Sequence, residues 1–285
     1  MMNRAIVVGV DGSKAAGTAL AWAAEDAERT GLPLRIVNVR EPWAAEHPLT
    51  AASGKETLTE RCNLLLDGAA ERARTLAPGT RISIALVTGA VMERLRSESE
   101  TAETLVVGSR GLGGYAGLAV GSVALGLAGH TDSPLVVVRV LPREERGEIV
   151  VGYDGSPDAD RAMAYALHRA TARTARVRVL YGRRYPVLAP HPAGYGPIPV
   201  DEAAEIGRRV APWRDKYPEV ELVESIVPGH PVPALVEASK AADLVVVGSR
   251  GRGGFTAAVL GSVSHGVLHR ARCPVAVIGT PGRRP

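Results

Sequence analysis

The chain contains few aromatic residues. Phe, Trp and Tyr together make up 4% of its 285 residues, and Phe occurs once. A core of packed aromatic rings is therefore excluded, and we expect an interior of Val, Leu, Ile and Ala. There are only two cysteines, Cys62 and Cys273, and they share no spacing typical of a metal site. This indicates reduced thiols and not a disulfide framework.

Long hydrophobic runs are also missing. No apolar run approaches the ~20 residues that a membrane-spanning helix needs. The opening MMNRAIVVGVDGS leads directly into a predicted strand and turn, not into a signal peptide. We therefore expect a cytoplasmic protein with no membrane partner.

Strong charge of one sign is absent as well. The net charge of +4 is mild and spread along the chain. Nucleic-acid binding usually needs a clustered basic face, so we expect no nucleic-acid partner. The charge is compatible with binding an anionic small molecule.

What the chain does contain is one pattern written twice. IVVGVDGS at 6–13 returns as IVVGYDGS at 149–156, an offset of 143 residues. ETLVVGSRGLGGYAGLAVGSV at 103–123 returns as DLVVVGSRGRGGFTAAVLGSV at 243–263, an offset of 140 residues. Units of this length are too long for a solenoid repeat and suit two similar domains.

Each half has the same order of predicted strands and helices. The strands are continuously apolar and alternate with helices, which indicates a parallel sheet buried on both faces. We therefore expect two tandem, doubly wound, five-stranded α/β domains, at 1–141 and 147–285. The predicted strands are 5–10, 34–39, 81–87, 104–107 and 135–140, then 148–153, 176–181, 220–226, 243–247 and 275–279. The predicted helices are 14–30, 56–76, 90–101 and 122–130, then 157–173, 201–214, 232–240 and 262–270.

A glycine-rich segment follows the fourth predicted strand of each half. In open α/β sheets, ligands bind beyond the carboxyl ends of the strands. Glycines that lead into a helix N-terminus suit a phosphate group, so we predict a phosphate site in each half. The predicted residues are Gly108, Ser109, Arg110, Gly111, Gly113, Gly114, Gly121, Ser122 and Val123, and their counterparts Gly248, Ser249, Arg250, Gly251, Gly253, Gly254, Gly261, Ser262 and Val263.

The glycine-rich segment has other interpretations. It does not end in the GK[ST] of a Walker A motif, and it follows the fourth strand where a dinucleotide fingerprint would follow the first. The glycines could instead form a tight or mobile loop, with Ser122 and Ser262 as plain helix N-caps. Arg110 and Arg250 are either phosphate partners or solvated loop residues.

An aspartate ends the first predicted strand of each half. Asp11 and Asp154 lie beside Gly9 and Gly152 in VVGVDGS and VVGYDGS. A carboxylate repels phosphate, so a ligand contact would be with an amino group such as adenine N6. The alternative is a carboxylate that caps its own Asp-Gly turn.

The end of the second strand completes the predicted site. Val39 is expected to line the base pocket with its backbone, and Gly182 is its counterpart in the second half. The two pockets are therefore expected to differ.

These motifs together resemble the universal stress protein family. The pattern Gly-x2-Gly-x9-Gly-Ser occurs at 108–122 and at 248–262, and the closing SPLVVV and CPVAVI are also similar to that family. The resemblance covers essentially the whole chain. It implies an adenine-nucleotide alpha-hydrolase-like fold with strand order 3-2-1-4-5. It also implies one ATP per domain; any Mg2+ would arrive with the nucleotide.

The resemblance assigns roles and a partner as well. Asp11 and Asp154 would meet the adenine, and the glycine loops would hold the ribose and phosphates. Family members pair through the last strand, here 135–140 and 275–279, so a homodimer or an intramolecular domain pair is expected. Ala124 stands where the second half has Ser264, which makes the first site the weaker candidate.

An enzymatic role finds little support in the residues. Hydrolysis needs a base and usually a metal clamp, and no His, Glu or Lys recurs on the predicted rim. His265 and His269 have helical ligand spacing but no evident third ligand, so no metal site is expected. We favour an ATP-binding regulatory stress-response protein with little or no turnover. The alternatives are a slow ATP hydrolase or fold-related ATP-using enzyme, and a nucleotide-free interaction module.

Overall fold

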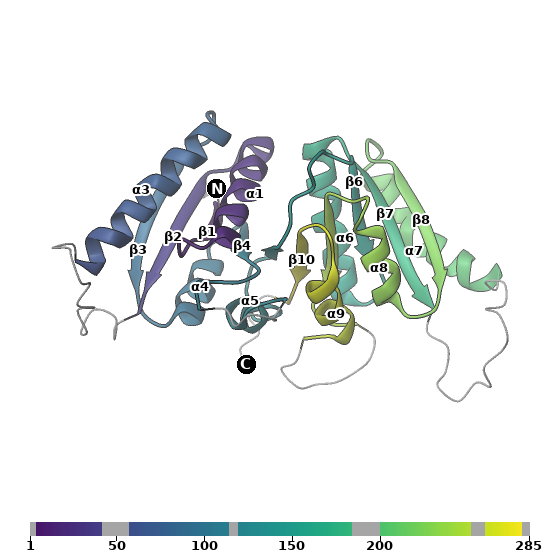
Figure 1. Ribbon diagram of the computed structural model, residues 1–285. Helices are drawn as coiled ribbons and strands as arrows, with labels where there is room; N and C mark the ends of the chain where they lie inside the picture. Colours follow the sequence, from purple (N-terminus) through teal and green to yellow (C-terminus); the bar gives the residue numbers. More distant parts are fainter. Residues whose placement is uncertain (1–3, 42–56, 114–118, 184–199, 252–259, 281–285) are drawn as a thin grey trace. The chain divides into compact units, whose positions relative to one another are not determined.

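The protein consists of two compact α/β units (Figure 1). The structure, a computed structural model, describes residues 4–41, 57–113, 119–183, 200–251 and 260–280. Unit 1 holds the described residues up to Leu141, and unit 2 runs from Pro142 to Ile278. The finer domain bounds of 1–141 and 147–285 stay a prediction.

Unit 1 is a parallel sheet with helices between its strands. Its strands are β1 (Ile6–Gly9), β2 (Leu34–Arg40), β3 (Ile82–Thr88), β4 (Thr104–Gly108) and β5 (Leu135–Val138). Its helices are α1 (Lys14–Thr30), α3 (Leu58–Leu76), α4 (Val91–Ser99) and α5 (Ser122–Leu127). The strands lie in the order β3-β2-β1-β4-β5, and all neighbours are parallel.

Unit 2 repeats this architecture. Its strands are β6 (Glu148–Gly152), β7 (Arg176–Arg183), β8 (Leu222–Pro228), β9 (Leu244–Gly248) and β10 (Val275–Ile278). Its helices are α6 (Pro157–Arg173), α7 (Val200–Lys216), α8 (Pro231–Ala238) and α9 (Ser262–Arg270). The parallel order is β8-β7-β6-β9-β10, so the predicted order 3-2-1-4-5 is confirmed in both units.

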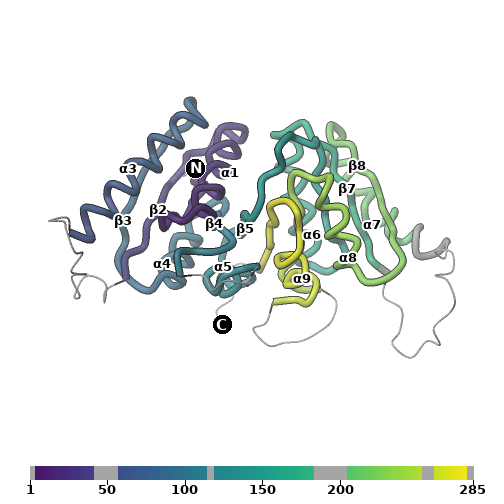
Figure 2. The backbone as a smooth tube through the Cα atoms, viewed as in Figure 1, coloured from purple at the N-terminus to yellow at the C-terminus, as the bar shows by residue number. Residues whose placement is uncertain are grey.

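The order of the strands creates a binding edge in each sheet. The chain of unit 1 starts at β1 in the middle, moves outward to β3, and returns to β4 and β5 on the other side (Figure 2). Because such crossovers are right-handed, the reversal puts α1 and α3 on one face of the sheet and α4 and α5 on the other. The packing agrees, since α1 contacts α3 and α4 contacts α5. The carboxyl ends of β1 and β4 flank the point of reversal, where ligands of doubly wound sheets bind.

The core is built from aliphatic side chains, as the composition predicts. Every residue of β5 and of β10 is buried, which confirms strands covered on both faces. Cys273 is buried beside β10, and burial raises the pKa of its thiol to about 12. No helix within the described ranges is long and apolar enough to cross a membrane.

The predicted elements are all found, with shifted ends. The clearest difference is α5, which was expected to run to residue 130 and ends at Leu127. Ala128 leaves the helical conformation with ψ of 114°, and Gly129 follows with φ of 80°. The glycine thus stops this helix earlier than the apolar pattern indicates.

Helices α1 and α6 end in the same left-handed backbone with different residues. Gly31 follows α1 with φ of 66°, and Thr174, its counterpart at the repeat offset, follows α6 with φ of 51°. Thr174 is the one residue other than glycine with positive φ among the described residues. A β-branched residue is strained in this region, whereas glycine is not.

We expect Thr174→Gly to stabilise unit 2. Relief of the left-handed strain should raise the free energy of unfolding by about 0.5–1 kcal/mol, after the extra entropy of the unfolded glycine is subtracted. Urea unfolding followed by circular dichroism measures this change. Thr75→Gly, inside α3, is the matched control and should destabilise. A Thr174→Gly protein that is less stable than the parent would contradict the strain argument.

Candidate functional site

The predicted site residues of unit 1 meet at the carboxyl ends of β1 and β4. The Leu112 N–H donates to Asp11 Oδ2 at 2.9 Å, and the Ser13 hydroxyl donates to the Arg110 carbonyl at 3.3 Å. The Gly121 N–H donates to the Ser109 carbonyl at 2.7 Å. The structure thus joins the turn after β1 to the start of the glycine loop, about a hundred residues away in the chain, and joins the two ends of the loop to each other.

Unit 2 repeats the same bonds where it is described. The Ser156 hydroxyl donates to the Arg250 carbonyl at 3.4 Å, and the Gly261 N–H donates to the Ser249 carbonyl at 2.8 Å. Gly114, Gly253 and Gly254 were also predicted to bind ligand, but they lie outside the described residues.

The first glycine of each loop is required by packing. A Cβ on Gly108 would lie 2.7 Å from the carbonyl carbon of Ala15, in the first turn of α1. A Cβ on Gly248 would lie 2.8 Å from the Cβ of Asp158, at the start of α6. At these distances a side chain would clash with the first turn of the helix. The two glycines therefore let a helix start directly against the end of a strand.

Asp11 and Asp154 cap their own turns. Asp11 Oδ1 accepts from the Ser13 N–H at 2.9 Å, and Asp154 Oδ1 accepts from the Ser156 N–H at 3.0 Å. The turn-capping interpretation is therefore correct for both residues. A Cβ on Gly111 would lie 2.6 Å from Asp11 Oδ2, so this glycine makes room for the carboxylate. A contact between these carboxylates and an adenine stays a prediction.

The last glycine of each loop is the N-cap of the following helix. Gly121 precedes α5 and Gly261 precedes α9, and neither helix has a side-chain cap. Ser122 and Ser262 are the first residues inside these helices, so the plain N-cap interpretation of the two serines is wrong. Val123 is half-buried and Ser122 exposed.

The small size of Gly121 has no cause within the described protein. Its φ is −80°, which any residue can adopt. An added Cβ would meet no atom closer than 3.5 Å, which is ordinary contact. At Gly261 the Ser249 carbonyl oxygen lies nearer, at 3.0 Å. In unit 1 the glycine therefore adds no side chain at a helix start whose first N–H groups have no side-chain cap.

The remaining predicted residues lie at the ends of neighbouring strands. Val39 is near the carboxyl end of β2, in register with Val87 of β3. A Cβ on Gly182 of β7 would lie 2.6 Å from the Cβ of Pro231, so this glycine accommodates the start of α8. Its difference from Val39 thus has a packing cause.

Gly9 and Gly152 lie against helices on the far face of each sheet. A Cβ on Gly9 would meet Leu95 of α4 at 3.2 Å, and one on Gly152 would meet Leu235 of α8 at 3.1 Å. Both glycines therefore have a packing role, and their predicted ligand contacts remain predictions.

Two residues that shape this edge, Asn38 and Asp158, were missed by the sequence analysis. Asn38 donates from Nδ2 to the Val10 carbonyl at 2.7 Å and so ties the end of β2 to the turn after β1. The buried Asp158 accepts from the Ser249 hydroxyl at 2.8 Å and from the Arg250 N–H at 3.1 Å. Asp158 also pairs with Arg161. A comparison of DGSKAAG with DGSPDAD shows Ala15 at the position of Asp158, and this was the available signal.

Ser264, which the sequence analysis noted as a hydroxyl that unit 1 lacks, has a structural role. It lies buried in α9, and its hydroxyl donates to the Gly248 carbonyl at 2.6 Å. The hydroxyl that unit 1 lacks at Ala124 thus ties a helix to a strand end. Its loss gives no reason to regard the first site as the weaker one. Asp158 places a carboxylate against the loop of unit 2, where unit 1 has Ala15. This difference would make the second site, and not the first, the weaker one.

No candidate metal centre is found in the described ranges, where no three His, Cys, Asp or Glu side chains cluster. The His265 and His269 rings lie 4.5 Å apart, centroid to centroid, on α9.

Two matches cover nearly the whole chain. The family model described as "Universal stress protein family" matches residues 2–139 and again 145–279. The universal stress protein Rv1996 of Mycobacterium tuberculosis is 33% identical over 304 residues, which cover 98% of this chain and 96% of that protein. The chain belongs to the universal stress protein family.

Solved structures agree on the fold of this universal stress protein. A universal stress protein from Archaeoglobus fulgidus superposes with a TM-score of 0.68 at 20% identity, and the match covers 98% of this chain and 99% of that one. This likeness shows the fold. A universal stress protein solved in complex with cAMP is 26% identical over 48% of this chain and 97% of its own, with a TM-score of 0.38.

We expect Ser264→Ala to lower the free energy of unfolding by about 1 kcal/mol, because the Gly248 carbonyl loses the hydrogen bond from the buried Ser264 hydroxyl. Urea unfolding measures this loss. Thr75→Ala is the matched control, since the exposed Thr75 hydroxyl bonds to the Glu71 carbonyl within its own helix. It should change the stability by less than about 0.5 kcal/mol. Equal losses in the two variants would contradict the structural role of Ser264.

Proposed function

We propose that each unit of this universal stress protein binds one ATP at the carboxyl edge of its sheet. The observation that carries the proposal is the start of α5. There the helix has no side-chain cap, and neither the backbone angle nor the packing of Gly121 requires a glycine. A phosphate group accepts from such N–H groups and is favoured by the positive end of the helix dipole.

The geometry also supports the orientation of the nucleotide. Asp11 uses one carboxylate oxygen for Ser13 and the other for Leu112, and an ionised carboxylate has about four acceptor sites in all. It can therefore accept from an adenine amino group as well. Arg110 and Arg250 are cations that recur at the start of both loops, and we assign them to the phosphates, with Mg2+ carried on the nucleotide itself.

Little turnover is proposed at this edge. Within the described part of the loops and turns, the acidic groups recurring in both units are Asp11 and Asp154, and both are engaged by backbone N–H groups. A carboxylate held this way is a poor base for activating water. The proposal is therefore a regulatory, cytoplasmic nucleotide-binding protein. Its predicted association through the last strands, 135–140 and 275–279, stays a prediction.

The decisive experiment is a calorimetric titration of Mg-ATP into nucleotide-free protein. We expect two sites in the parent, one each in Gly121→Glu and Gly261→Glu, and none in the double variant. The added carboxylate occupies the phosphate space and repels the phosphate charge. A folded Gly121→Glu protein that keeps two sites would overturn the phosphate assignment.

Two controls separate phosphate exclusion from damage to the fold. Gly79→Glu adds the same side chain in the turn before β3, where a Cβ meets no atom closer than 3.6 Å, and should keep both sites. Gly121→Ala adds bulk without charge at a position that tolerates a Cβ and should retain the native circular dichroism spectrum.

Asp158 gives the two proposed sites unequal affinity. Its carboxylate holds the Ser249 hydroxyl and the Arg250 N–H at the start of the loop, where unit 1 has Ala15. We expect Asp158→Asn to tighten ATP binding by unit 2 roughly fivefold, since one unit charge at ~4 Å contributes ~1 kcal/mol in a water-like medium. Titration in the Gly121→Glu background isolates unit 2. Asp215→Asn, on the exposed surface of α7, is the control for net charge and should leave the affinity unchanged.

The alternatives to the proposal have different outcomes. A slow hydrolase would release phosphate over many turnovers from the parent protein and not from the double glycine variant. A nucleotide-free interaction module would neither bind Mg-ATP nor co-purify with a nucleotide.

A further inference from the structure

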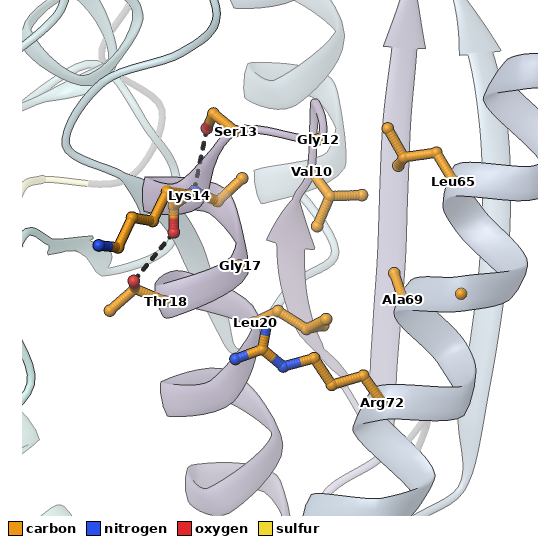
Figure 3. Close-up of a pocket in the computed structure, with 12 residues that line it drawn as sticks. Val10, Gly12, Ser13, Lys14, Gly17, Thr18, Leu20, Leu65, Ala69 and Arg72 are labelled. Carbon is orange, nitrogen blue, oxygen red and sulfur yellow. Dashed lines mark hydrogen bonds between the residues drawn. The ribbon is translucent and has the colours of Figure 1, made fainter.

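Unit 1 contains a cavity of about 500 Å³ between α1 and α3 (Figure 3). Cavities that bind small molecules have volumes of roughly 300–1,000 Å³. None of the residues predicted to hold the nucleotide lines it. The lining residues are Val10, Gly12, Ser13, Lys14, Ala16, Gly17, Thr18, Leu20, Leu65, Gly68, Ala69 and Arg72.

The lining combines apolar surface with a few polar side chains, and one of its two cations reaches across it. The side chains of Val10, Leu20 and Leu65 supply apolar surface, and the glycines and alanines leave the space open. Figure 3 shows that Arg72 extends from α3 toward α1, whereas Lys14 points away from α3. A Cβ on Gly17 would lie 3.1 Å from Arg72 Nη1, so the guanidinium lies close to the backbone of α1.

The charge of Arg72 has no counterion in the cavity. The lining includes no Asp or Glu. Among the described residues, none of the ion pairs involves Arg72. A partly apolar cavity beside an exposed guanidinium with no acidic partner favours a ligand that brings its own negative charge.

Unit 2 fills the corresponding space from its first strand and helix. At the offset of 143, Tyr153 stands for Val10 and Asp160 stands for Gly17. The Tyr153 ring is buried, and its hydroxyl donates to Asp160 Oδ1 at 2.7 Å. Burial and the neighbouring Asp160 raise the pKa of Tyr153, so it remains a neutral donor.

Unit 2 also fills this space from its second helix. Ile82 of β3 and Leu222 of β8 hold equivalent register positions, an offset of 140, and this offset pairs Ala69 with Arg209 and Leu65 with Glu205. Arg209 donates to Glu205 at 2.8 Å and to the Gly155 carbonyl at 3.3 Å. The same fold thus packs large side chains where unit 1 has small ones, so the opening is a property of the sequence of unit 1 and not of the fold.

We propose that the cavity between α1 and α3 of unit 1 binds a small, largely apolar molecule that carries one anionic group. The apolar part lies against Val10, Leu20 and Leu65. The anionic group meets the guanidinium of Arg72. This site is separate from the proposed nucleotide sites, and the proposal does not depend on them.

The test uses two probes of matched shape in a fluorescence titration. The anionic probe is 8-anilinonaphthalene-1-sulfonate, and the neutral one is N-phenyl-1-naphthylamine. We expect one anionic probe bound per folded chain. Arg72→Gln should weaken the anionic probe about tenfold, the effect of one charge-assisted hydrogen bond, and should leave the neutral probe unchanged. Arg74 is also exposed on α3 but lies outside the cavity, so Arg74→Gln should leave the affinity for both probes unchanged.

Variants that fill the cavity test its location. Val10→Tyr combined with Gly17→Asp copies the filling that unit 2 already uses, and it should abolish binding of both probes. Ala69→Phe fills the space from α3 alone and should also abolish binding of both probes. It replaces the double variant as the test if that variant does not fold. A near-ultraviolet circular dichroism spectrum identifies the folded variants.

Three results would overturn the proposal. The first is binding of the anionic probe that survives in a folded filled variant. The second is binding that does not respond to Arg72→Gln. The third is displacement of the probe by saturating Mg-ATP, which would make the cavity part of a nucleotide site.

Discussion

The approach of the first turn of α1 to the end of β4 sets the geometry of the whole binding edge in unit 1. The carbonyl carbon of Ala15 lies so close to Gly108 that a Cβ would be 2.7 Å away. This contact brings the turn that holds Asp11 and Ser13 within hydrogen-bonding distance of the glycine loop. Unit 2 has the same approach at Gly248, where Asp158 lies in the first turn of α6. The packing of the helix against the strand end therefore requires glycine at these two positions, independently of any ligand.

The fold could be predicted almost completely from the sequence, because repetition and apolar runs are local signals. The repetition of each motif predicted two units. Continuous runs of Val and Leu predicted strands that are buried on both faces. The end of α5 could not be predicted from its apolar pattern, because Gly129 overrides that pattern. The position of the site was also within reach, since the carboxyl ends of β1 and β4 must lie at one edge.

The chemistry of individual site residues was less predictable. The roles of Asp158 and Ser264 depend on which atoms face them in the fold. The partner of Asp158 lies about ninety residues away in the chain, and that of Ser264 lies sixteen residues away. Spacing along the chain cannot report such contacts. The comparison of the two copies does report where to look, because Ala15 and Ala124 stand at the corresponding positions. Tyr153 in place of Val10 is a third example, and it changes an open cavity into a packed one.

The carboxylate of Asp11 holds the Ser13 N–H with one oxygen and the Leu112 N–H with the other. It therefore joins the cap of α1 to the middle of the glycine loop through one small group. Under the proposed function, an adenine amino group would share this carboxylate with both N–H groups, so the adenine contact and the order of the loop would be linked in free energy. Under the proposed function, the conformation of the glycine loop would therefore depend on which ligand occupies this edge.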